Sequence, residues 1–437
     1  MAWVVDVNMG YGHSRAAYAL RDLSGGQVLS ANDYSGIPAG DRKLWKQSRE
    51  VYETISRIKP VPIVGSFLFE ALDHWQEIPK FYPRRDLSKP NLQLRQIYHH
   101  IKQGLGRHLV ARLATHPVPL VTTFFLPAFA AEYYDYPGEI YCVTTDADVS
   151  RTWAPLDPKR SRIKYFASNG RVVERLKLYG VREENIFLTG FPLPKELIGG
   201  PKAQVLKRDL AARICRLDPK GIFAERYRRT LQAGLGQYRC EPPSHEPITL
   251  TYTVGGAGAQ RHLATQILES LHGNIIRQEM RLILVAGPRP DIVAYFKESA
   301  IQMGLREQLG TWVQIPKFTS RYEYFSGFSE ILKTTDILWT KPSELSFYTG
   351  LGLPIVIAPP IGSQEDFNRL WLQYVGGGIP QNDPKYTNEW LFDWIRSGGM
   401  ARMAWSGYIE APTHGTYRIE DIMLGVKSEL PTLPLIV

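Results

Sequence analysis

Short apolar runs separated by helix-sized intervals follow one another along most of the chain. The runs are rich in β-branched and aromatic residues and end at Gly, Pro or polar residues, which predicts strands. Strands that alternate with helices in this way form parallel sheets flanked by helices, so the predicted fold class is α/β. The predicted strands are residues 3–8, 120–125, 140–144, 164–167, 186–189, 248–254, 281–286, 312–315, 337–340 and 354–358.

Both halves of the chain begin with a strand, a glycine-rich turn and a helix. The strand at residues 3–8 leads into Gly10-Tyr11-Gly12-His13 and a predicted helix over residues 14–23. The strand at 248–254 leads into Gly255-Gly256-Ala257-Gly258 and a predicted helix over 260–271. This duplicated architecture predicts two Rossmann-like domains that face each other across a cleft.

The expected domain boundaries lie where this pattern is interrupted. Residues 1–200 are expected to form the N-terminal domain, with a helical insertion at 43–110, and residues 246–397 the C-terminal domain. Residues 201–245 are basic and weakly periodic, which favours a linker or an insertion. The tail, residues 398–437, can pack back on the N-terminal domain.

Composition narrows the class of protein. A hydrophobic fraction of 44% excludes a disordered chain, and 437 residues predict two or three domains. Three Cys without a CxxC pair make a disulfide framework or a structural zinc site unexpected, which favours a reducing, cytoplasmic location. The longest apolar stretch is too short and too interrupted to span a membrane, and the N-terminus lacks the basic start of a signal peptide.

The positive charge is unevenly distributed. The chain has 52 Lys and Arg against 43 Asp and Glu, and the excess falls in residues 1–245, whereas residues 246–437 are mildly acidic. Residues 201–245 alone hold ten basic and four acidic side chains. This pattern suggests one face that meets an anionic partner. Nucleic acid is weakly supported, because no known binding module and no groove-reading basic helix is present.

The predicted insertion at 43–110 combines aromatic with basic residues. Exposed aromatic rings beside cations suit a membrane interface or a sugar-binding face. An ordinary helical insertion whose aromatic residues lie in the core fits equally well. The residues concerned are Trp45, Tyr52, Phe67, Phe69, Trp75, Phe81, Tyr82, Arg84, Arg85 and Lys89.

Two positions in the first half carry candidate chemistry. The Gly10 and Gly12 turn lacks the third glycine of a dinucleotide fingerprint, which disfavours a nicotinamide or flavin enzyme. The turn would still let backbone amides approach an anion, and His13 could take a proton from a hydroxyl, although a histidine in a turn is commonly structural. Asp146 ends a buried strand, where catalytic groups of parallel sheets gather, but it can equally cap the next turn.

The second half is richest in polar signals between Thr340 and Asn368. Ser343 can N-cap a helix whose first turn presents Glu344, and a carboxylate there can hold the hydroxyls of a ribose. Gln364, Glu365 and Asn368 follow the predicted strand at 354–358 in what reads as a polar loop. The glycine turn at 255–258 is placed to approach a ligand, or is simply a tight turn between strand and helix.

Together these features resemble one family, the two-domain (GT-B) glycosyltransferases. The similar group holds the monogalactosyldiacylglycerol synthases, the processive diacylglycerol glucosyltransferases and the lipid-linked peptidoglycan N-acetylglucosaminyltransferase. The resemblance covers residues 3–23, 43–75, 140–195 and 250–380. It rests on the order and spacing of six motifs.

In the first half the resemblance concerns the base and the end of the domain. Gly10, Gly12 and His13 match a Gly-x-Gly-His turn whose His is the proposed base on the acceptor hydroxyl. Thr145, Asp146 and Trp153 match a Thr-Asp…His-x-x-Trp segment, in which Arg151 stands where His is usual. The segment from Gly180 to Pro192 matches the run that closes the N-terminal domain.

In the second half the resemblance concerns the donor. It implies that the glycine turn (Gly255, Gly256, Gly258) opens the nucleotide domain, that Phe318 lies beside the base and that Glu344 binds the ribose. Gln364, Glu365 and Asn368 match a Gly-Gln-Glu…Asn loop near the donor sugar. One departure stands out, because the Gly-Pro-Gly loop that holds the donor diphosphate is absent and Lys341-Pro342-Ser343 runs directly into Glu344. Lys341, Ser343 and the helix N-terminus could replace those amides.

The resemblance implies an inverting transfer, without metal or cofactor, from a nucleoside-diphosphate sugar, in the first place a UDP-sugar, to a hydroxyl. His13 or Asp146 would act as the base. The charge of residues 1–245 favours a membrane lipid acceptor, reached from the cytoplasmic side of an anionic membrane. A hydrolysing UDP-sugar 2-epimerase of the same fold and a catalytically silent nucleotide-sugar-binding relative remain as alternatives.

Overall fold

The computed structural model describes residues 1–46, 78–240, 246–255, 258, 260–427 and 429–433, and these residues form two compact units. Unit 1 comprises Met1–Leu193, Ile361–Asn368 and His414–Val437. Unit 2 comprises Pro194–Pro360 and Arg369–Thr413. Helix α15 (Ser363–Tyr374) therefore begins in unit 1 and ends in unit 2.

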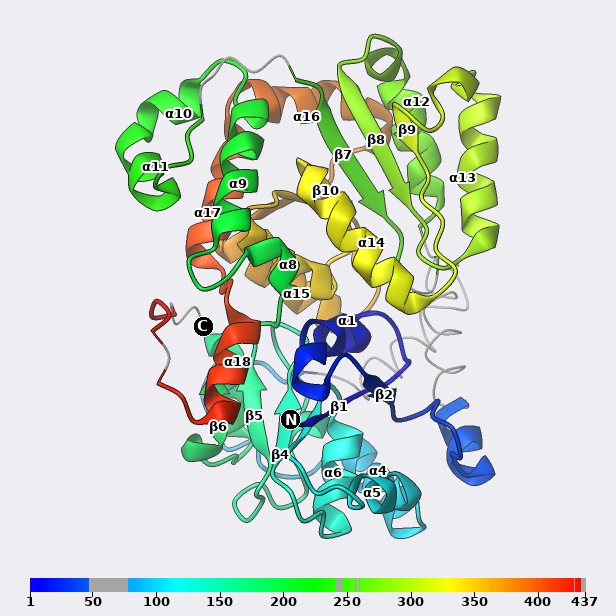
Figure 1. Cartoon of the computed structure of the whole chain (residues 1–437), viewed down its shortest axis with the longest axis vertical. Coiled ribbons are helices and arrows are strands. Elements are labelled where there is room, and N and C mark those ends of the chain that lie inside the picture. Colours follow the sequence, from blue (N-terminus) through cyan, green and yellow to red (C-terminus); the bar gives the residue numbers. More distant parts are fainter. Residues whose placement is uncertain (47–77, 241–245, 256–257, 259, 428, 434–437) are drawn as a thin grey trace. The chain divides into compact units, whose positions relative to one another are not determined.

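Unit 1 is built on a six-stranded parallel sheet with the order β2-β1-β3-β4-β5-β6 (Figure 1). The strands are β1 (Trp3–Asp6), β2 (Val28–Ser30), β3 (Leu120–Thr122), β4 (Ile140–Val143), β5 (Lys164–Ala167) and β6 (Ile186–Leu188). Its α-helices are α1 (Gly12–Ala19), α4 (Leu92–Lys102), α5 (Arg107–Leu113), α6 (Phe125–Tyr133), α7 (Gly170–Leu178) and α18 (Gly415–Leu424). Short 3-10 helices lie at η1 (Arg21–Ser24), η2 (Arg151–Trp153) and η3 (Glu183–Asn185).

Alternate residues of these strands enter two different hydrophobic clusters. Val5, Leu120 and Cys142 belong to one cluster, together with residues of α4, α5 and α6. Val4 and Val121 belong to the other, which also contains Ile419 of α18. Side chains of a strand point alternately to opposite faces, so the two clusters cover the two faces of the sheet. The last helix of the C-terminal tail thus completes the core of unit 1.

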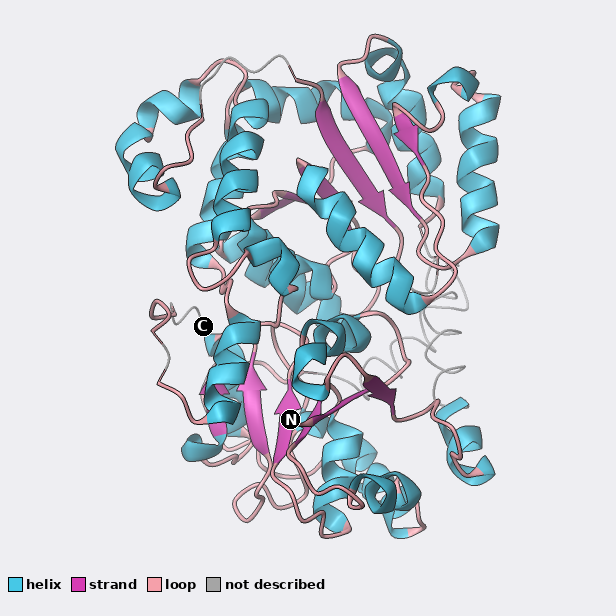
Figure 2. Ribbon diagram, in the orientation of Figure 1, coloured by secondary structure: helices cyan, strands magenta, loops and turns pink. Residues whose placement is uncertain are grey.

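Unit 2 holds a second six-stranded parallel sheet, with the order β12-β11-β10-β7-β8-β9. Its strands are β7 (Ile248–Thr253), β8 (Met280–Val285), β9 (Val313–Gln314), β10 (Ile337–Thr340), β11 (Ile355–Ile357) and β12 (Gly378–Pro380). Figure 2 shows the strands of each sheet bordered by helices. The helices of unit 2 are α8 (Lys195–Ile198), α9 (Gln204–Leu217), α10 (Ile222–Arg226), α11 (Arg228–Leu235), α12 (His262–Ile276), α13 (Pro290–Gln302), α14 (Arg321–Thr334), α16 (Thr387–Arg396), α17 (Gly399–Glu410), η4 (Arg306–Gln308), η5 (Glu344–Leu351) and η6 (Pro384–Tyr386).

The sequence suggested a linker or an insertion at 201–245, and the described part of this basic stretch, residues 201–240, contains three helices of unit 2. Helix α9 buries Leu206, Leu210 and Leu217, which recur at helical spacing. Its apolar face is interrupted by Arg213, a buried side chain that donates hydrogen bonds to the carbonyl oxygens of Thr335, Leu351 and Gly352. Arg213 therefore interrupts the apolar periodicity of α9 in the sequence.

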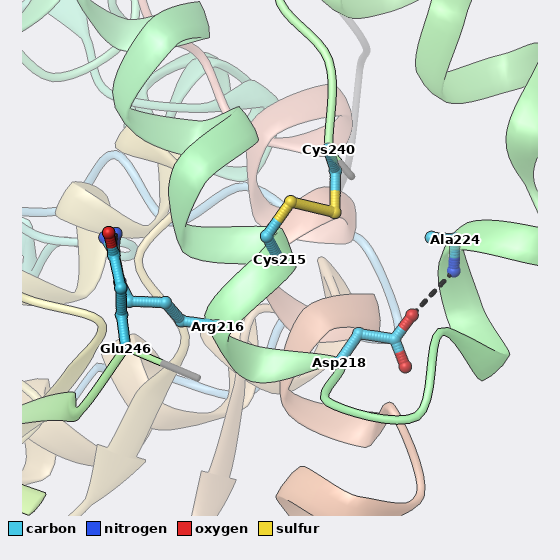
Figure 3. Close-up of a disulfide and its surroundings, with 6 residues drawn as sticks. All are labelled: Cys215, Arg216, Asp218, Ala224, Cys240 and Glu246. Carbon is cyan, nitrogen blue, oxygen red and sulfur yellow. Dashed lines mark hydrogen bonds and ion pairs between the residues drawn. A yellow bond between two sulfur atoms is a disulfide. The ribbon is translucent and has the colours of Figure 1, made fainter. Parts of the chain in front are cut away.

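A disulfide joins Cys215 at the end of α9 to Cys240 (Figure 3). The two cysteines are 25 residues apart, and their Cα atoms lie 5.2 Å apart. Between them, the buried Asp218 accepts a hydrogen bond of 2.8 Å from the backbone N–H of Ala224 at the start of α10. From the cysteine count we expected no disulfide framework. The bridge between Cys215 and Cys240 encloses only the segment that contains α10 and α11.

Several local predictions can be compared with the structure. Asn169 N-caps α7, since its side chain accepts a hydrogen bond from the N–H of Val172. In the 43–110 segment, Trp45 and Phe81 are buried while Tyr82 is exposed. Tyr52, Phe67, Phe69 and Trp75 lie outside the described residues. Among the described residues, no helix combines the length and apolarity that crossing a membrane requires.

Candidate functional site

His13 lies at the point in unit 1 where the strand order reverses. Strand β1 pairs with both β2 and β3, so the chain leaves β1 on one side and returns on the other. In open parallel sheets ligands bind beyond the carboxyl ends of the strands at such a switch point. Gly10 follows β1 with φ of 113°, a conformation that favours glycine, and Gly12 begins α1. His13 is thereby the second residue of a helix that starts at this edge.

Hydrogen bonds fix the tautomer of His13. Its Nδ1 lies 2.7 Å from the carbonyl oxygen of Thr123, which follows β3, and 3.2 Å from Oγ1 of Thr145, which follows β4. A carbonyl oxygen can only accept, so Nδ1 carries the proton and Nε2 presents a lone pair. The rings of Phe124 and Trp153 lie 4.9 and 6.2 Å from the imidazole, centroid to centroid.

Burial lowers the pKa of His13 to about 4, although the hydrogen bond to Thr123 and the charge of Asp6 act in the opposite direction. The imidazole is therefore neutral at pH 7. A neutral imidazole with its lone pair on Nε2 can accept a proton from a hydroxyl. The residues that follow three adjacent strands, His13 after β1, Thr123 after β3 and Thr145 after β4, build this arrangement. The sequence singled out His13 and Thr145 but not Thr123.

Asp146 is held by a residue far away in the sequence. Nδ2 of Asn368 donates a hydrogen bond of 3.0 Å to Oδ1 of Asp146, and Oδ1 of Asn368 accepts one of 2.7 Å from the backbone N–H of Ala147. Asn368 is fully buried, whereas Asp146 is partly exposed. All three residues belong to unit 1. Asn368 thus orients the loop after β4, a contact different from the donor sugar that the resemblance implied.

The third residue of the Asp146-Ala147-Asp148 segment has a structural role. Both carboxylate oxygens of the buried Asp148 accept hydrogen bonds from guanidinium groups, from Arg175 at 2.8 and 2.9 Å and from Arg171 at 2.7 Å. A carboxylate neutralised by two arginines is a poor metal ligand. In the part of the chain that the structure describes, no three His, Cys, Asp or Glu residues gather as a metal site would require.

Arg151, which stands where the similar family has His, also has a structural role. The buried guanidinium donates to the carbonyl oxygens of Ser88, Ala154 and Pro155. It therefore ties the segment before α4 to η2. It cannot act as a base, because a guanidinium stays protonated at any ordinary pH.

In unit 2 the strand order reverses between β7 and β10. Gly255 follows β7, and Lys341 follows the neighbouring β10. A Cβ on Gly255 would lie 2.5 Å from Cε of Lys341, so the lysine side chain lies directly against this glycine. Gly258 has φ of +67° and is also closely approached by a side chain. Gly256 lies outside the described residues.

The segment after Lys341 differs from the predicted one. Ser343 precedes a 3-10 helix, η5, and its side chain makes no capping hydrogen bond. Glu344 opens η5 and is buried, with 8% of its surface exposed. Gly352, in the left-handed conformation, ends this eight-residue segment. Phe318 packs on α14, against Gly327 and 5.3 Å from Tyr324.

The predicted polar loop at 362–368 is wrong, because Gln364, Glu365 and Asn368 lie on the first turns of α15. Glu365 is buried, and its carboxylate accepts a hydrogen bond of 2.8 Å from the N–H of Ile361 just before the helix. Acidic residues at a helix start stabilise it. The apolar Phe367 and Trp371 follow at a spacing of four, a helical pattern that the sequence analysis did not use.

Comparison with known proteins indicates which fold this chain has. No family model and no curated protein sequence matches the chain. Among solved structures, the UDP-GlcNAc 2-epimerase from Neisseria meningitidis bound to UDP-GlcNAc is 12% identical with a TM-score of 0.51, covering 97% of this chain and 99% of that chain. MurG from Acinetobacter baumannii is 12% identical with a TM-score of 0.49 and coverage of 97% and 99%. S. aureus MnaA with UDP is 12% identical with a TM-score of 0.48 and coverage of 99% and 99%.

The Neisseria epimerase and the two six-stranded parallel sheets together establish the fold class. The chain has the GT-B fold, with two Rossmann-like α/β units, as the sequence predicted. In each unit, candidate residues lie beyond the carboxyl ends of the strands at the switch point.

Proposed function

We propose that the chain is a glycosyltransferase that moves a sugar from a nucleoside-diphosphate sugar, in the first place a UDP-sugar, to a hydroxyl acceptor. The observation that carries the proposal is the neutral His13, whose Nε2 lone pair is fixed by donation from Nδ1 to Thr123 at the switch point of unit 1. The GT-B fold supports it, since a solved protein of this fold is bound to UDP-GlcNAc.

In the proposed step the acceptor oxygen forms a bond to the anomeric carbon of the donor sugar, and the bond from that carbon to the diphosphate breaks. The hydroxyl proton passes to Nε2 of His13, and the diphosphate leaves with the bonding electrons. Attack from the opposite side inverts the anomeric centre. With a pKa of about 4, the imidazole is unprotonated at neutral pH and can therefore accept the hydroxyl proton.

Asp146 is the alternative base. Its carboxylate is partly exposed and oriented by Asn368. We propose neither cofactor nor divalent metal in this step, because Asp148, the second carboxylate of the Asp-x-Asp spacing, is engaged by Arg171 and Arg175.

The proposed acceptor is a membrane lipid, reached by a peripheral protein on the cytoplasmic side of an anionic membrane. The basic excess of residues 1–245 supports this, because each basic group near such a surface contributes about 1 kcal/mol. Co-sedimentation with vesicles tests it. Recruitment should require anionic lipid and weaken with salt, and equal recruitment to neutral vesicles would contradict the lipid surface.

A hydrolysing UDP-sugar 2-epimerase is the second candidate, favoured by the likeness to the Neisseria enzyme. A catalytically silent relative is the third, favoured by the missing Gly-Pro-Gly loop before Glu344.

One experiment separates the three functions. The protein is incubated with a panel of sugar nucleotides and lipid vesicles, and lipids and nucleotide products are analysed by mass spectrometry. A glycosylated lipid supports the transferase, and its loss in His13→Ala at saturating substrates supports the base. An epimerised free sugar without transfer supports the epimerase. Unchanged sugar nucleotides with every donor refute both enzymes.

A further inference from the structure

Helices α10 and α11 form an excursion of unit 2, defined here as residues 219–239 and enclosed by the disulfide between Cys215 and Cys240 (Figure 3). Figure 1 shows both helices beyond α9 and α17, on the side of these two helices that faces away from the strands of unit 2. Helix α10 contacts α17, and α11 contacts α9. These contacts cover one face of the excursion.

The covered face of the excursion is apolar. Phe223 of α10 and both Leu231 and Leu235 of α11 are buried. The two leucines are four residues apart, so they lie on the same side of their helix. Gly234, between them, lies directly against the indole of Trp405 in α17. The excursion is thus held on unit 2 by a small hydrophobic contact, and its other face is left to solvent.

The outer face of the excursion is strongly basic. Its charged side chains are all exposed, and they comprise five basic residues and a single acidic one, Glu225. The basic residues are Lys220, Arg226, Arg228, Arg229 and Arg239. A nearby arginine of the same basic stretch behaves differently, because Arg216 of α9 forms ion pairs with Asp336 at 2.8 Å and with Glu246 at 3.0 Å. The charge of the excursion instead faces solvent, where an anionic partner can reach it.

Two large apolar side chains lie among these cations. Ile222 is 48% exposed and Tyr227 is 37% exposed. Ile222 and Arg226 are four residues apart on α10 and therefore share a face, and Cζ of Arg226 lies 5.7 Å from the ring centroid of Tyr227. Tyr227 directly precedes Arg228 and Arg229 at the start of α11. Apolar side chains and guanidinium groups therefore form one continuous patch.

This combination fits the surface of an anionic membrane. Guanidinium groups bind phosphate oxygens in pairs, and the negative surface potential of such a membrane attracts clustered basic residues. Tyrosine is enriched at membrane interfaces, and an aliphatic side chain can enter the boundary between headgroups and acyl chains. A nucleic acid would satisfy the arginines through its phosphates, but it would offer Ile222 no comparable apolar surroundings.

We propose that the outer face of the excursion docks unit 2 onto an anionic membrane surface. The arginines contact headgroup phosphates, and Ile222 and Tyr227 lie at the boundary with the acyl chains. The inference rests on the proposed action at a membrane lipid and names the surface that makes the contact. That surface lies in unit 2, whereas the sequence directed attention to the aromatic and basic segment at 43–110.

The test is co-sedimentation of the full-length protein, without reductant, with vesicles of phosphatidylcholine alone or of phosphatidylcholine and phosphatidylglycerol in equal parts, over a range of salt concentrations. One variant combines Arg226→Gln, Arg228→Gln and Arg229→Gln, and a second combines Ile222→Ser and Tyr227→Ser. The matched control combines Lys297→Gln, Arg306→Gln and Lys385→Gln, which removes the same charge from other exposed positions of unit 2. Circular dichroism and thermal unfolding check that each variant is folded.

The wild type should bind the anionic vesicles and bind phosphatidylcholine alone weakly. Each cation at the surface raises the affinity about fivefold, so the triple arginine variant should lose about 100-fold on anionic vesicles. The matched control should lose less than about fivefold. The apolar variant should lose about tenfold, and its loss should persist at high salt, because salt screens charge attraction and leaves apolar burial in place.

Several results would overturn the inference. A wild type that binds no anionic vesicles refutes it, and so does a triple arginine variant that loses no more than the matched control. A labelled DNA duplex, a single-stranded RNA and polyglutamate are titrated in parallel. If one of them binds through the three arginines while the vesicles do not bind, the patch serves another partner and the membrane surface is wrong.

Failure of the inference and failure of the proposed function give different results. If anionic vesicles bind equally well to the triple arginine variant and the control, the excursion is refuted as the docking surface, and action at a membrane remains open to another face. If vesicles bind through the excursion but no sugar nucleotide yields a glycosylated lipid, the docking surface stands and the proposed transfer to lipid fails.

Discussion

The low pKa of His13 makes the stability of the protein depend on pH in a defined direction. Folding holds the imidazole neutral with a pKa of about 4, whereas in the unfolded chain its ordinary value is 6.5. Between these values the unfolded chain binds more protons, so acidification favours unfolding. The stabilisation is fully present above pH 6.5 and is lost as the pH falls towards about 4.

The pKa shift of His13 corresponds to about 3 kcal/mol in the free energy of unfolding. Because the ring is partly exposed, we expect a contribution of about 2 kcal/mol. The perturbation is His13→Asn, which removes the titrating group but places an amide nitrogen near the position of Nδ1, so donation to the carbonyl of Thr123 can persist. The stability of wild type relative to this variant should therefore fall by about 2 kcal/mol between about pH 7.5 and about pH 4.5.

Two measurements check this. Urea unfolding at several pH values gives the stability difference, and NMR of histidine-labelled protein gives the pKa directly, with the His13 signal assigned by its loss in the variant. A ring signal that titrates near 6.5, or a stability difference that does not vary with pH, would refute the reasoning about burial. If the His13 pKa proves to be the ordinary one, the pH below which kcat/KM of the proposed reaction falls should be higher by the same amount.

Three further predictions concern other contacts. Asn368→Ala leaves the buried N–H of Ala147 without its acceptor and should lower the free energy of unfolding by about 1–3 kcal/mol, measured by urea unfolding. Arg213→Met removes donors to several buried carbonyl oxygens and should cost about 3 kcal/mol or more, measured in the same way. Reduction of Cys215–Cys240 opens a 25-residue loop and should cost up to about 3.5 kcal/mol in the chain-entropy view, seen as a lower Tm with reductant.

Each of these has a control within the chain. Asn388 and Arg208 are exposed, so their replacement by Ala and Met should cost less than about 1 kcal/mol. The third cysteine, Cys142, is buried and free, so the denatured, unreduced protein should expose one thiol and the reduced protein three. Three thiols before reduction would contradict the disulfide, and equal losses at buried and exposed positions would contradict the contacts assigned to Asn368 and Arg213.

Elements that depend on local pattern could be predicted from the sequence. The alternating strands and helices indicated two α/β units, and the Gly10 and Gly255 turns marked the first strand of each. A helix cap such as Asn169 is also a local feature, because capping needs only residues three positions apart. Where polar and apolar signals compete within a few residues, as in α15 and around Arg213 in α9, the local pattern misled us.

Contacts between distant residues were decided by the tertiary structure alone. Asp146 and Asn368 are 222 positions apart, and only the folded unit shows that one orients the other. Asp148 is only two positions from Asp146, yet the fold places Arg171 and Arg175 against it. The sequence by itself determined which kinds of residue follow each strand. The order of strands in the sheets decided which of those residues meet, because strands adjacent in a sheet are separated by tens of residues in the chain.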